Sequence, residues 1–556
     1  MDSPSRFRSL WSRRVHPEPP EIVRLVTLLH EYATQLSTLS RARIVTVPGD
    51  VHINLLRLEM SGIVLNNEDA SDVGAALRQF PSLRLLDLRD CCMQPRGVLA
   101  LATHMARSRL RSLSQLLLGG NWTEADSEMS VRCITAVSEA LVAAGAHALE
   151  TLSLSNGMLP QGAVALCNAL ALLHPPLTHL DVSDSRFGYG GAAALLKCHQ
   201  RAPFNKLSSL DLFACHIGPR GGDVIGRLLA SPISGSPPLA LRVLCLADNA
   251  IQDRGLAALA TALRTNAILA ATLEELDVSS NGIGLEDDSS LVLAHGTSAC
   301  EDFAHALAAA NVASAPGGGG LALRRLNISQ NFIHDGGMHA FASALEAVPH
   351  LEWLDISCCN VNDVGLRSLA QHFNGPGSPQ LQTLGTYNQG RAVTDGAARA
   401  LLLALRAGAP QLTALHAGRL NMDGSGEGSA GAAAVSLVEA RPLLRYVDLR
   451  DNTRLDAELG ARLDACCAKR QQLQVHRPDE AWPEQESNDI FSAMEGWHQD
   501  GLVESRQMWC RWSQTVWFYR GEDHGGEHDQ PVYVIEEPGG ELNHVASGMP
   551  HAEEEV

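Results

Sequence analysis

The pattern L-x-x-L-x-L recurs thirteen times along this chain of 556 residues. Nine clear copies begin at residues 83, 113, 149, 177, 207, 241, 273, 323 and 351, and four weaker copies begin at residues 53, 381, 412 and 444. Successive copies start 28–36 residues apart, except for one interval of 50 residues. Chance does not give such a series, so a unit of about 30 residues repeats along most of the chain.

Each unit predicts a short strand followed by a helix. In the copy at 241–263, LRVLCLADNAIQDRGLAALATAL, leucines at the fourth and sixth positions alternate with other residues, as in a strand with one buried face. The segment 253–263 then places Leu256, Leu259 and Leu263 at the spacing of a helix with one apolar stripe. One strand and one helix cannot bury their apolar faces alone, so stacked units must share a continuous core.

A small polar residue follows many of the predicted strands at a fixed place. Three residues after the sixth position, eight copies have Asn or Cys: Cys91, Asn121, Cys215, Asn249, Asn281, Asn331, Cys359 and Asn452. A side chain at this place turns inward and can bond backbone groups of adjacent turns that would otherwise be buried without partners. These cysteines therefore need no catalytic role.

The units resemble leucine-rich repeats of the ribonuclease-inhibitor type, whose longer repeats contain a full helix, and the copy at 241–263 is close to their consensus. The resemblance covers residues 50–475 and implies an α/β fold. This fold is a leucine-rich repeat solenoid, or horseshoe, with a parallel concave sheet, convex helices and about thirteen repeats. Ribonuclease inhibitors, Ran GTPase-activating proteins, sensor domains of innate immune receptors and subunits of ciliary assemblies share this fold, so the resemblance leaves the function open.

The repeats predict four parts of the chain. Residues 1–19 are predicted to be a disordered basic N-terminus, and residues 20–49 an N-terminal capping helix. This segment has the spacing of an amphipathic helix over residues 20–40, with prolines at its start. Residues 50–475 form the predicted repeat domain, and residues 476–556 form a tryptophan-rich acidic extension.

The C-terminal extension differs from the repeats in composition. It contains five of the eight tryptophans, and eighteen acidic residues against four arginines. Two interpretations are open. The extension packs on the last repeat as a cap, or it binds a partner through Trp509, Trp512 and Trp517, because tryptophan is frequent in interface hot spots.

The net charge of −19 excludes some classes of partner. An acidic chain disfavours the phosphate backbone, so we expect no nucleic-acid partner, and the lack of a long apolar stretch predicts no contact with a membrane. A protein with a basic surface is a better match. An odd number of cysteines, 13, and no apolar secretion signal predict reduced thiols and a cytoplasmic location.

The candidate binding residues lie on the concave strand face, between the buried leucines. The fifth position is aspartate in six copies: Asp87, Asp181, Asp211, Asp277, Asp355 and Asp448. Four aromatic residues occupy neighbouring places: Phe213, Trp353, Tyr387 and Tyr446. Together they predict a curved acidic surface with aromatic anchors for a basic protein. The alternative is that the aspartates belong to the repeat pattern itself and have a structural role.

No motif for nucleophilic, metal or nucleotide chemistry is found, so the chain is predicted to be non-catalytic and to need no cofactor or metal. The first hypothesis is a scaffold that binds partner proteins through the concave face and the C-terminal extension. By analogy it is a subunit of a cytoskeletal or ciliary assembly. The alternatives are a ribonuclease-inhibitor-like regulator and a Ran-type GTPase-activating protein. In the latter family an arginine in an early loop lies near the nucleotide, and Arg96 is the positional match here.

Overall fold

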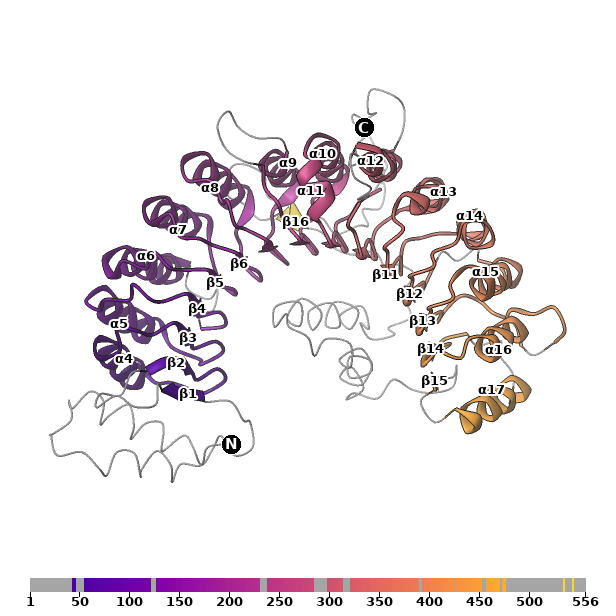
Figure 1. The fold of residues 1–556 in the computed structure, drawn as a ribbon, viewed down its shortest axis with the longest axis horizontal. Helices are drawn as coiled ribbons and strands as arrows, with labels where there is room; N and C mark the ends of the chain where they lie inside the picture. Colours follow the sequence, from indigo (N-terminus) through magenta and orange to yellow (C-terminus); the bar gives the residue numbers. More distant parts are fainter. Residues whose placement is uncertain are drawn as a thin grey trace, which may run out of the picture. The chain divides into compact units, whose positions relative to one another are not determined.

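The computed structural model describes residues 43–46, 55–121, 127–230, 238–284, 298–313, 321–389, 393–424, 426–452, 457–470, 473–476, 534–535 and 543–544. The chain divides into two compact units, Met1–Asn249 and Ala250–Val556. In each unit short strands alternate with helices, and the helices cover one face of the strands (Figure 1).

The first unit begins with an antiparallel strand pair and continues with parallel strands. Its strands are β1 (Arg43–Thr46), β2 (Leu55–Glu59), β3 (Leu85–Asp87), β4 (Gln115–Leu117), β5 (Thr151–Ser153), β6 (His179–Asp181), β7 (Ser209–Asp211) and β8 (Val243–Cys245). Its helices are α4 (Asn67–Ala76), η1 (Leu77–Gln79), α5 (Pro95–Ala106), α6 (Ser127–Ala144), α7 (Pro160–Leu173), α8 (Gly188–Arg201) and α9 (Gly218–Leu229). Strands β2 to β8 pair in parallel, in sequence order, and β1 runs antiparallel to β2.

The second unit repeats the same alternation. Its strands are β9 (Glu275–Asp277), β10 (Arg325–Asn327), β11 (Trp353–Asp355), β12 (Thr383–Gly385), β13 (Ala414–His416), β14 (Tyr446–Asp448) and β15 (Gln474–His476), with a separate antiparallel pair β16 (Val534–Ile535) and β17 (Asn543–His544). Its helices are α10 (Gln252–Thr265), α11 (Ala267–Thr272), α12 (Ala299–Ala313), α13 (His334–Ala344), η2 (Leu345–Ala347), α14 (Asp363–Asn374), α15 (Asp395–Gly408), α16 (Ala430–Ala440) and α17 (Ala457–Lys469). Strands β9 to β15 pair in parallel, in sequence order.

The strand register confirms the predicted α/β solenoid of leucine-rich units. Fourth-position leucines pair across neighbouring strands, as Leu86 does with Leu116 and Leu354 with Leu384. These leucines are buried. Burial of one leucine side chain contributes about 1.5–3 kcal/mol, so the row of stacked leucines is the main stabilising element of each unit.

The register corrects the place of the first repeat. Leu58 pairs with Leu86, so Leu58 occupies the fourth position. The pattern therefore reads LLRLEM at 55–60 and not INLLRL at 53–58. Met60 then takes the sixth position, where it is fully buried. The frame that begins at 55 is the one that places this methionine in the core.

Further observations concern the ends of the repeat array. A fourteenth parallel strand, β15, follows the last predicted copy and places Val475 at the fourth position. The capping helix predicted for residues 20–49 is wrong at residues 43–46, which form the strand β1 and pair with β2 at the edge of the sheet. The predicted helix at 20–40 and the predicted disorder at 1–19 lie outside the described residues.

The Asn and Cys residues after the strands form the predicted internal ladder. Oδ1 of Asn331 accepts hydrogen bonds from the backbone N–H groups of Asn281 and Ile283, at 3.0 and 3.1 Å. Its Nδ2 donates to three backbone carbonyl oxygens at 3.0–3.2 Å. At the same place in the next repeat, the thiol of Cys359 donates to the carbonyl of Ile328 at 3.3 Å. The prediction that this row satisfies buried backbone groups is confirmed.

Candidate partner-binding surface

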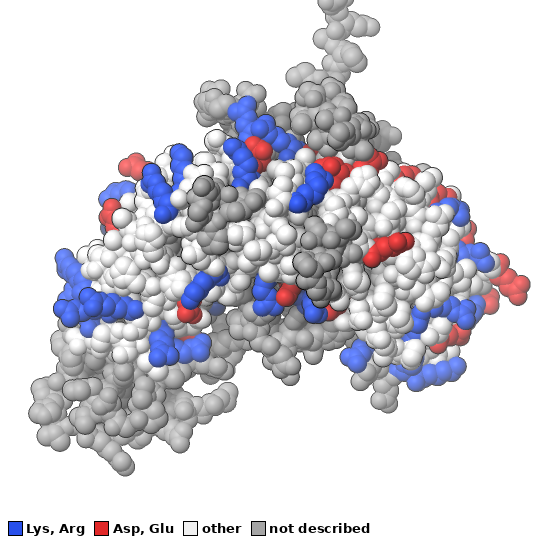
Figure 2. Space-filling model, turned by 45° about the horizontal axis from the view of Figure 1, so that its top comes forward, with Lys and Arg blue, Asp and Glu red and all other residues white. Residues whose placement is uncertain are grey.

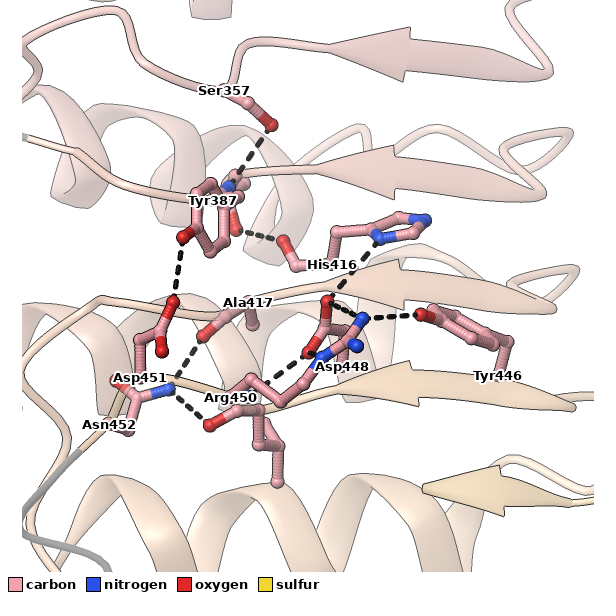
Figure 3. A network of polar contacts seen from close by, with 11 residues as sticks. Ser357, Tyr387, His416, Ala417, Tyr446, Asp448, Arg450, Asp451 and Asn452 are labelled. Carbon is pink, nitrogen blue, oxygen red and sulfur yellow. Dashed lines mark hydrogen bonds and ion pairs between the residues drawn. The ribbon is translucent and has the colours of Figure 1, made fainter. Parts of the chain in front are cut away.

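The strand face of the second unit has a cluster of aromatic side chains. Residues at the third and fifth positions point away from the helices, because successive side chains of a strand alternate between its two faces. Trp353 on β11, His416 on β13 and Tyr446 on β14 occupy such positions, and Tyr387 lies two residues after the end of β12. We call these four residues the aromatic face; Tyr387 and His416 are half-buried, whereas Trp353 and Tyr446, which the sequence predicted as partner contacts, are buried. Figure 3 shows Tyr387, His416 and Tyr446.

Hydrogen bonds fix the orientation of Tyr387. Its hydroxyl donates to Oδ2 of Asp451 at 2.7 Å, and its backbone N–H donates to the hydroxyl of Ser357 at 3.1 Å. Burial raises the pKa of the Tyr387 phenol, and so do the hydrogen bond and the negative charge of Asp451. The ring is therefore neutral at physiological pH and held in one position.

A buried ion pair holds the β14 end of the aromatic face. Nε and Nη2 of Arg450 donate to the two carboxylate oxygens of Asp448, each at 2.9 Å, and both side chains are 1% exposed. Nη2 also donates to the hydroxyl of Tyr446 at 3.3 Å. The ring of His416 lies 4.9 Å from the ring of Tyr446, and its Nδ1 is 4.0 Å from Asp448. Arg450 thus neutralises a buried carboxylate and orients the tyrosine.

The six aspartates at the fifth strand position share a turn-forming hydrogen bond. In each, Oδ1 accepts the backbone N–H of the residue two positions later, at 2.8–3.1 Å: Asp87, Asp181, Asp211, Asp277, Asp355 and Asp448. Asn327 makes the same bond from the same position, at 3.0 Å. Because an uncharged residue serves equally well, the turn uses the acceptor oxygen and not the charge. This geometry favours the structural interpretation of the aspartates.

Burial further reduces the negative charge that these aspartates present. Four of the six are buried: Asp87, Asp211, Asp277 and Asp448. Asp87 pairs with Arg89, whose Nη2 lies 2.7 Å from Oδ2. Burial raises the pKa of Asp277 to about 7, so this carboxyl holds a proton more readily than a free one. Asp181 and Asp355 are half-buried and are the members of the row that keep some exposure.

The first unit brings together three of the predicted site residues. Asp181 on β6 pairs in register with Asp211 on β7, and Phe213 lies two residues after the end of β7 and is half-buried. The hydroxyls of Ser153 and Ser183 donate to Asp181, at 2.7 and 2.5 Å. The carboxylate of Asp181 therefore already accepts hydrogen bonds from two hydroxyl groups of the protein.

The remaining predicted site residues are distant from these groups or lie outside the described residues. Asp87 is on β3, three strands from β6, and is no part of the group around Asp181. The predicted anchors Trp509, Trp512 and Trp517 lie outside the described residues. Sequence reasoning missed Arg450, although the Asp-x-Arg spacing of Asp87–Arg89 recurs at Asp448–Arg450.

Neither a metal centre nor a membrane segment emerges from the described part of the chain. Among these residues, no three or more His, Cys, Asp and Glu side chains gather so that they could hold a metal ion. No described helix combines the length and the apolar character needed to cross a bilayer.

Comparison with known proteins defines the class to which this fold belongs. A family model described as "Leucine Rich repeat" matches five segments of the chain: 81–102, 174–196, 241–260, 270–287 and 349–370. Four of these matches span a strand and part of the helix that follows it, and the match at 270–287 contains the strand β9. The chain is a leucine-rich repeat protein of the ribonuclease-inhibitor-like type.

Three curated proteins are similar to parts of the chain. Ran GTPase-activating protein of Drosophila melanogaster is 32% identical over 23% of this chain, and Ran GTPase-activating protein 1 of Xenopus laevis is 32% identical over 22%. Capping protein, Arp2/3 and myosin-I linker protein 2 of Mus musculus is 41% identical over 16% of this chain. The similarity covers 22%, 22% and 7% of these relatives, so it spans less than a quarter of each.

Proposed function

We propose that this protein is a non-catalytic interaction scaffold and that a partner protein binds the aromatic face. Leucine-rich repeats suggest a role in protein interaction. The observation that supports this surface is the hydrogen-bonded network around Tyr387, His416 and Tyr446 (Figure 3). Aromatic side chains held in one orientation lose little conformational entropy when a partner binds, which favours affinity.

The charge of the second unit supports a basic partner. Its described residues include nineteen acidic side chains and fourteen lysines and arginines. Asp451, which is exposed, and Asp355, which is half-buried, lie beside the aromatic face. An acidic surface attracts a basic protein during encounter, and Tyr387 and His416, the half-buried members of the aromatic face, then supply the aromatic contact.

We extend the proposal to the C-terminal extension and to location. Trp509, Trp512 and Trp517 would provide a second binding site, on the composition argument alone. The partial similarity to the mouse linker, whose name refers to capping protein, Arp2/3 and myosin-I, supports a cytoplasmic scaffold associated with the cytoskeleton.

The aromatic face can be tested by removing Tyr387. Loss of a hot-spot tyrosine costs about 2 kcal/mol of binding, so Tyr387→Ala should reduce recovery of a specific partner more than tenfold in quantitative affinity capture from native extract. Val364→Ala, at a 63% exposed position on α14, is the matched control and should leave recovery unchanged. An unaltered partner list with the folded Tyr387→Ala protein would contradict the proposal.

GTPase activation is the second candidate, supported by the two relatives named Ran GTPase-activating proteins. Arg96 is exposed and is the second residue of α5. The scaffold proposal predicts that the chain does not accelerate GTP hydrolysis by Ran in a single-turnover assay. Stimulation that Arg96→Ala abolishes, while Arg132→Ala on α6 does not, would replace the scaffold with an activating protein.

A further inference from the structure

Two neighbouring loops of the first unit have five arginines and no acidic residue. They are residues 77–84, which begin with the short helix η1, and residues 107–114, and each segment connects a helix to the next strand. We call the five arginines the basic edge: Arg78, Arg84, Arg107, Arg109 and Arg111. All five are exposed. Figure 2 shows Lys and Arg side chains gathered over the N-terminal repeats, at the left of the view.

Backbone and side-chain contacts place the two loops side by side. The N–H of Ser114 donates to the carbonyl of Arg84 at 2.8 Å. Nη2 of Arg78, in the first loop, lies 3.4 Å from Nδ1 of His104, which is in the last turn of α5 next to the second loop. The two segments that hold the five arginines are therefore neighbours in successive repeats.

The arginines of the basic edge make no ion pair with any described residue. At the corresponding edge of the second unit, by contrast, Arg324 pairs with Glu352. A helix C-terminus favours nearby cations, which accounts for Arg78 and Arg107 but not for Arg109 and Arg111, which lie beyond the helix end. The helix ends therefore account for only part of the positive charge at the basic edge.

The positive charge of the edge acts on a neighbouring histidine. Burial lowers the pKa of His104, the charges of Arg78 and Arg107 lower it further, and the charge of Asp72 opposes this by raising it. The described residues of the first unit contain seventeen lysines and arginines against fourteen acidic residues, in a chain whose net charge is −19. The edge is therefore locally opposite in sign to the whole protein.

We infer that the basic edge binds an acidic, carboxylate-rich segment of a partner protein. Arginine forms bidentate hydrogen bonds with carboxylates, and several arginines in a row suit an extended acidic chain. The leucines and the phenylalanine of the two loops are buried: Leu77, Phe80, Leu83, Leu110 and Leu113. The patch thus offers no exposed aromatic ring to stack on bases and no large apolar group to enter a lipid surface. This site is separate from the aromatic face, and its test does not depend on that proposal.

The test uses the full chain and a fluorescent peptide of alternating glutamate and serine. Arg107→Glu/Arg111→Glu should weaken peptide binding by at least about tenfold at low salt, because attraction becomes repulsion at two contacts. Arg132→Glu/Arg220→Glu, which changes two exposed arginines on α6 and α9 by the same charge, should alter affinity by no more than about twofold. Circular dichroism of each variant confirms that it is folded.

Three results would overturn the inference. The first is no binding of the peptide by the wild-type chain at low salt. The second is an equal loss of affinity in the edge variant and in its control. The third is tighter, edge-dependent binding of a DNA duplex, or of vesicles of phosphatidylserine and phosphatidylcholine, which would assign the edge to nucleic acid or to a membrane. A tenfold loss confined to the edge variant and to the acidic peptide supports it.

Discussion

Arg450→Ala should lower the free energy of unfolding by about 3–5 kcal/mol. Arg450 and Asp448 are both 1% exposed, and the guanidinium gives the carboxylate two of its short hydrogen bonds. Without Arg450 the carboxylate would remain buried without its guanidinium partner, and a buried charge that has lost its partner is strongly destabilising. Urea unfolding followed by circular dichroism measures the change.

Two comparisons separate this effect from a general loss of arginine. Arg324→Ala breaks an ion pair in which Arg324 is 54% exposed and Glu352 is 27% exposed, so it should cost about 0–1 kcal/mol. The double variant Asp448→Asn/Arg450→Met removes both charges and should recover more than half of the loss, because no unpaired charge remains. If Arg450→Ala and Arg324→Ala lowered the free energy of unfolding equally, burial of the Asp448–Arg450 pair would make no difference to stability.

The fold could be predicted because the repeated leucines dominate the energetics of each unit. Even the weaker copies at 381 and 412 form regular strands, β12 and β13. Thr386 replaces leucine at a buried sixth position, and its hydroxyl donates to the carbonyl of His416 at 2.9 Å. A hydroxyl that is satisfied in this way can occupy a core position. The sequence does not fix the first copy, because leucines at 55, 56 and 58 fit a repeat that begins at residue 53 or at residue 55.

The candidate site was harder to predict than the fold. Aspartate at the fifth strand position is equally compatible with a partner contact and with a turn, and the sequence alone does not choose. The choice depends on where Oδ1 points, and in all six copies it points to the N–H two residues later. The partner of a buried carboxylate is also a matter of side-chain direction, which is why Arg450 was missed.

The two units differ in net charge, and each of the two proposed binding surfaces lies in a unit of matching sign. Acidic residues exceed basic ones among the described residues of the second unit, and the reverse holds in the first. The aromatic face lies in the acidic unit and the basic edge in the other. A scaffold with two surfaces of opposite sign can select two partners of different chemistry, because each surface repels the partner of the other.

Asn331→Ala should lower the free energy of unfolding by about 3 kcal/mol. The Asn331 side chain is 1% exposed and makes five hydrogen bonds with the backbone. Its removal leaves the N–H groups of Asn281 and Ile283 buried without their acceptor, and each such group costs about 1–3 kcal/mol, partly relieved by relaxation. Urea unfolding again measures the loss.

Cys359→Ala is the matched control for this ladder. Cys359 occupies the same place one repeat later and is fully buried, but its sulfur has only weak partners: it donates to the carbonyl of Ile328 at 3.3 Å and accepts from the backbone N–H of Asn331. Its loss should therefore cost only about 1 kcal/mol, for weak sulfur hydrogen bonds and a small cavity. If Asn331→Ala costs no more than Cys359→Ala, the backbone groups between repeats find other partners, and the asparagine ladder is not what satisfies them.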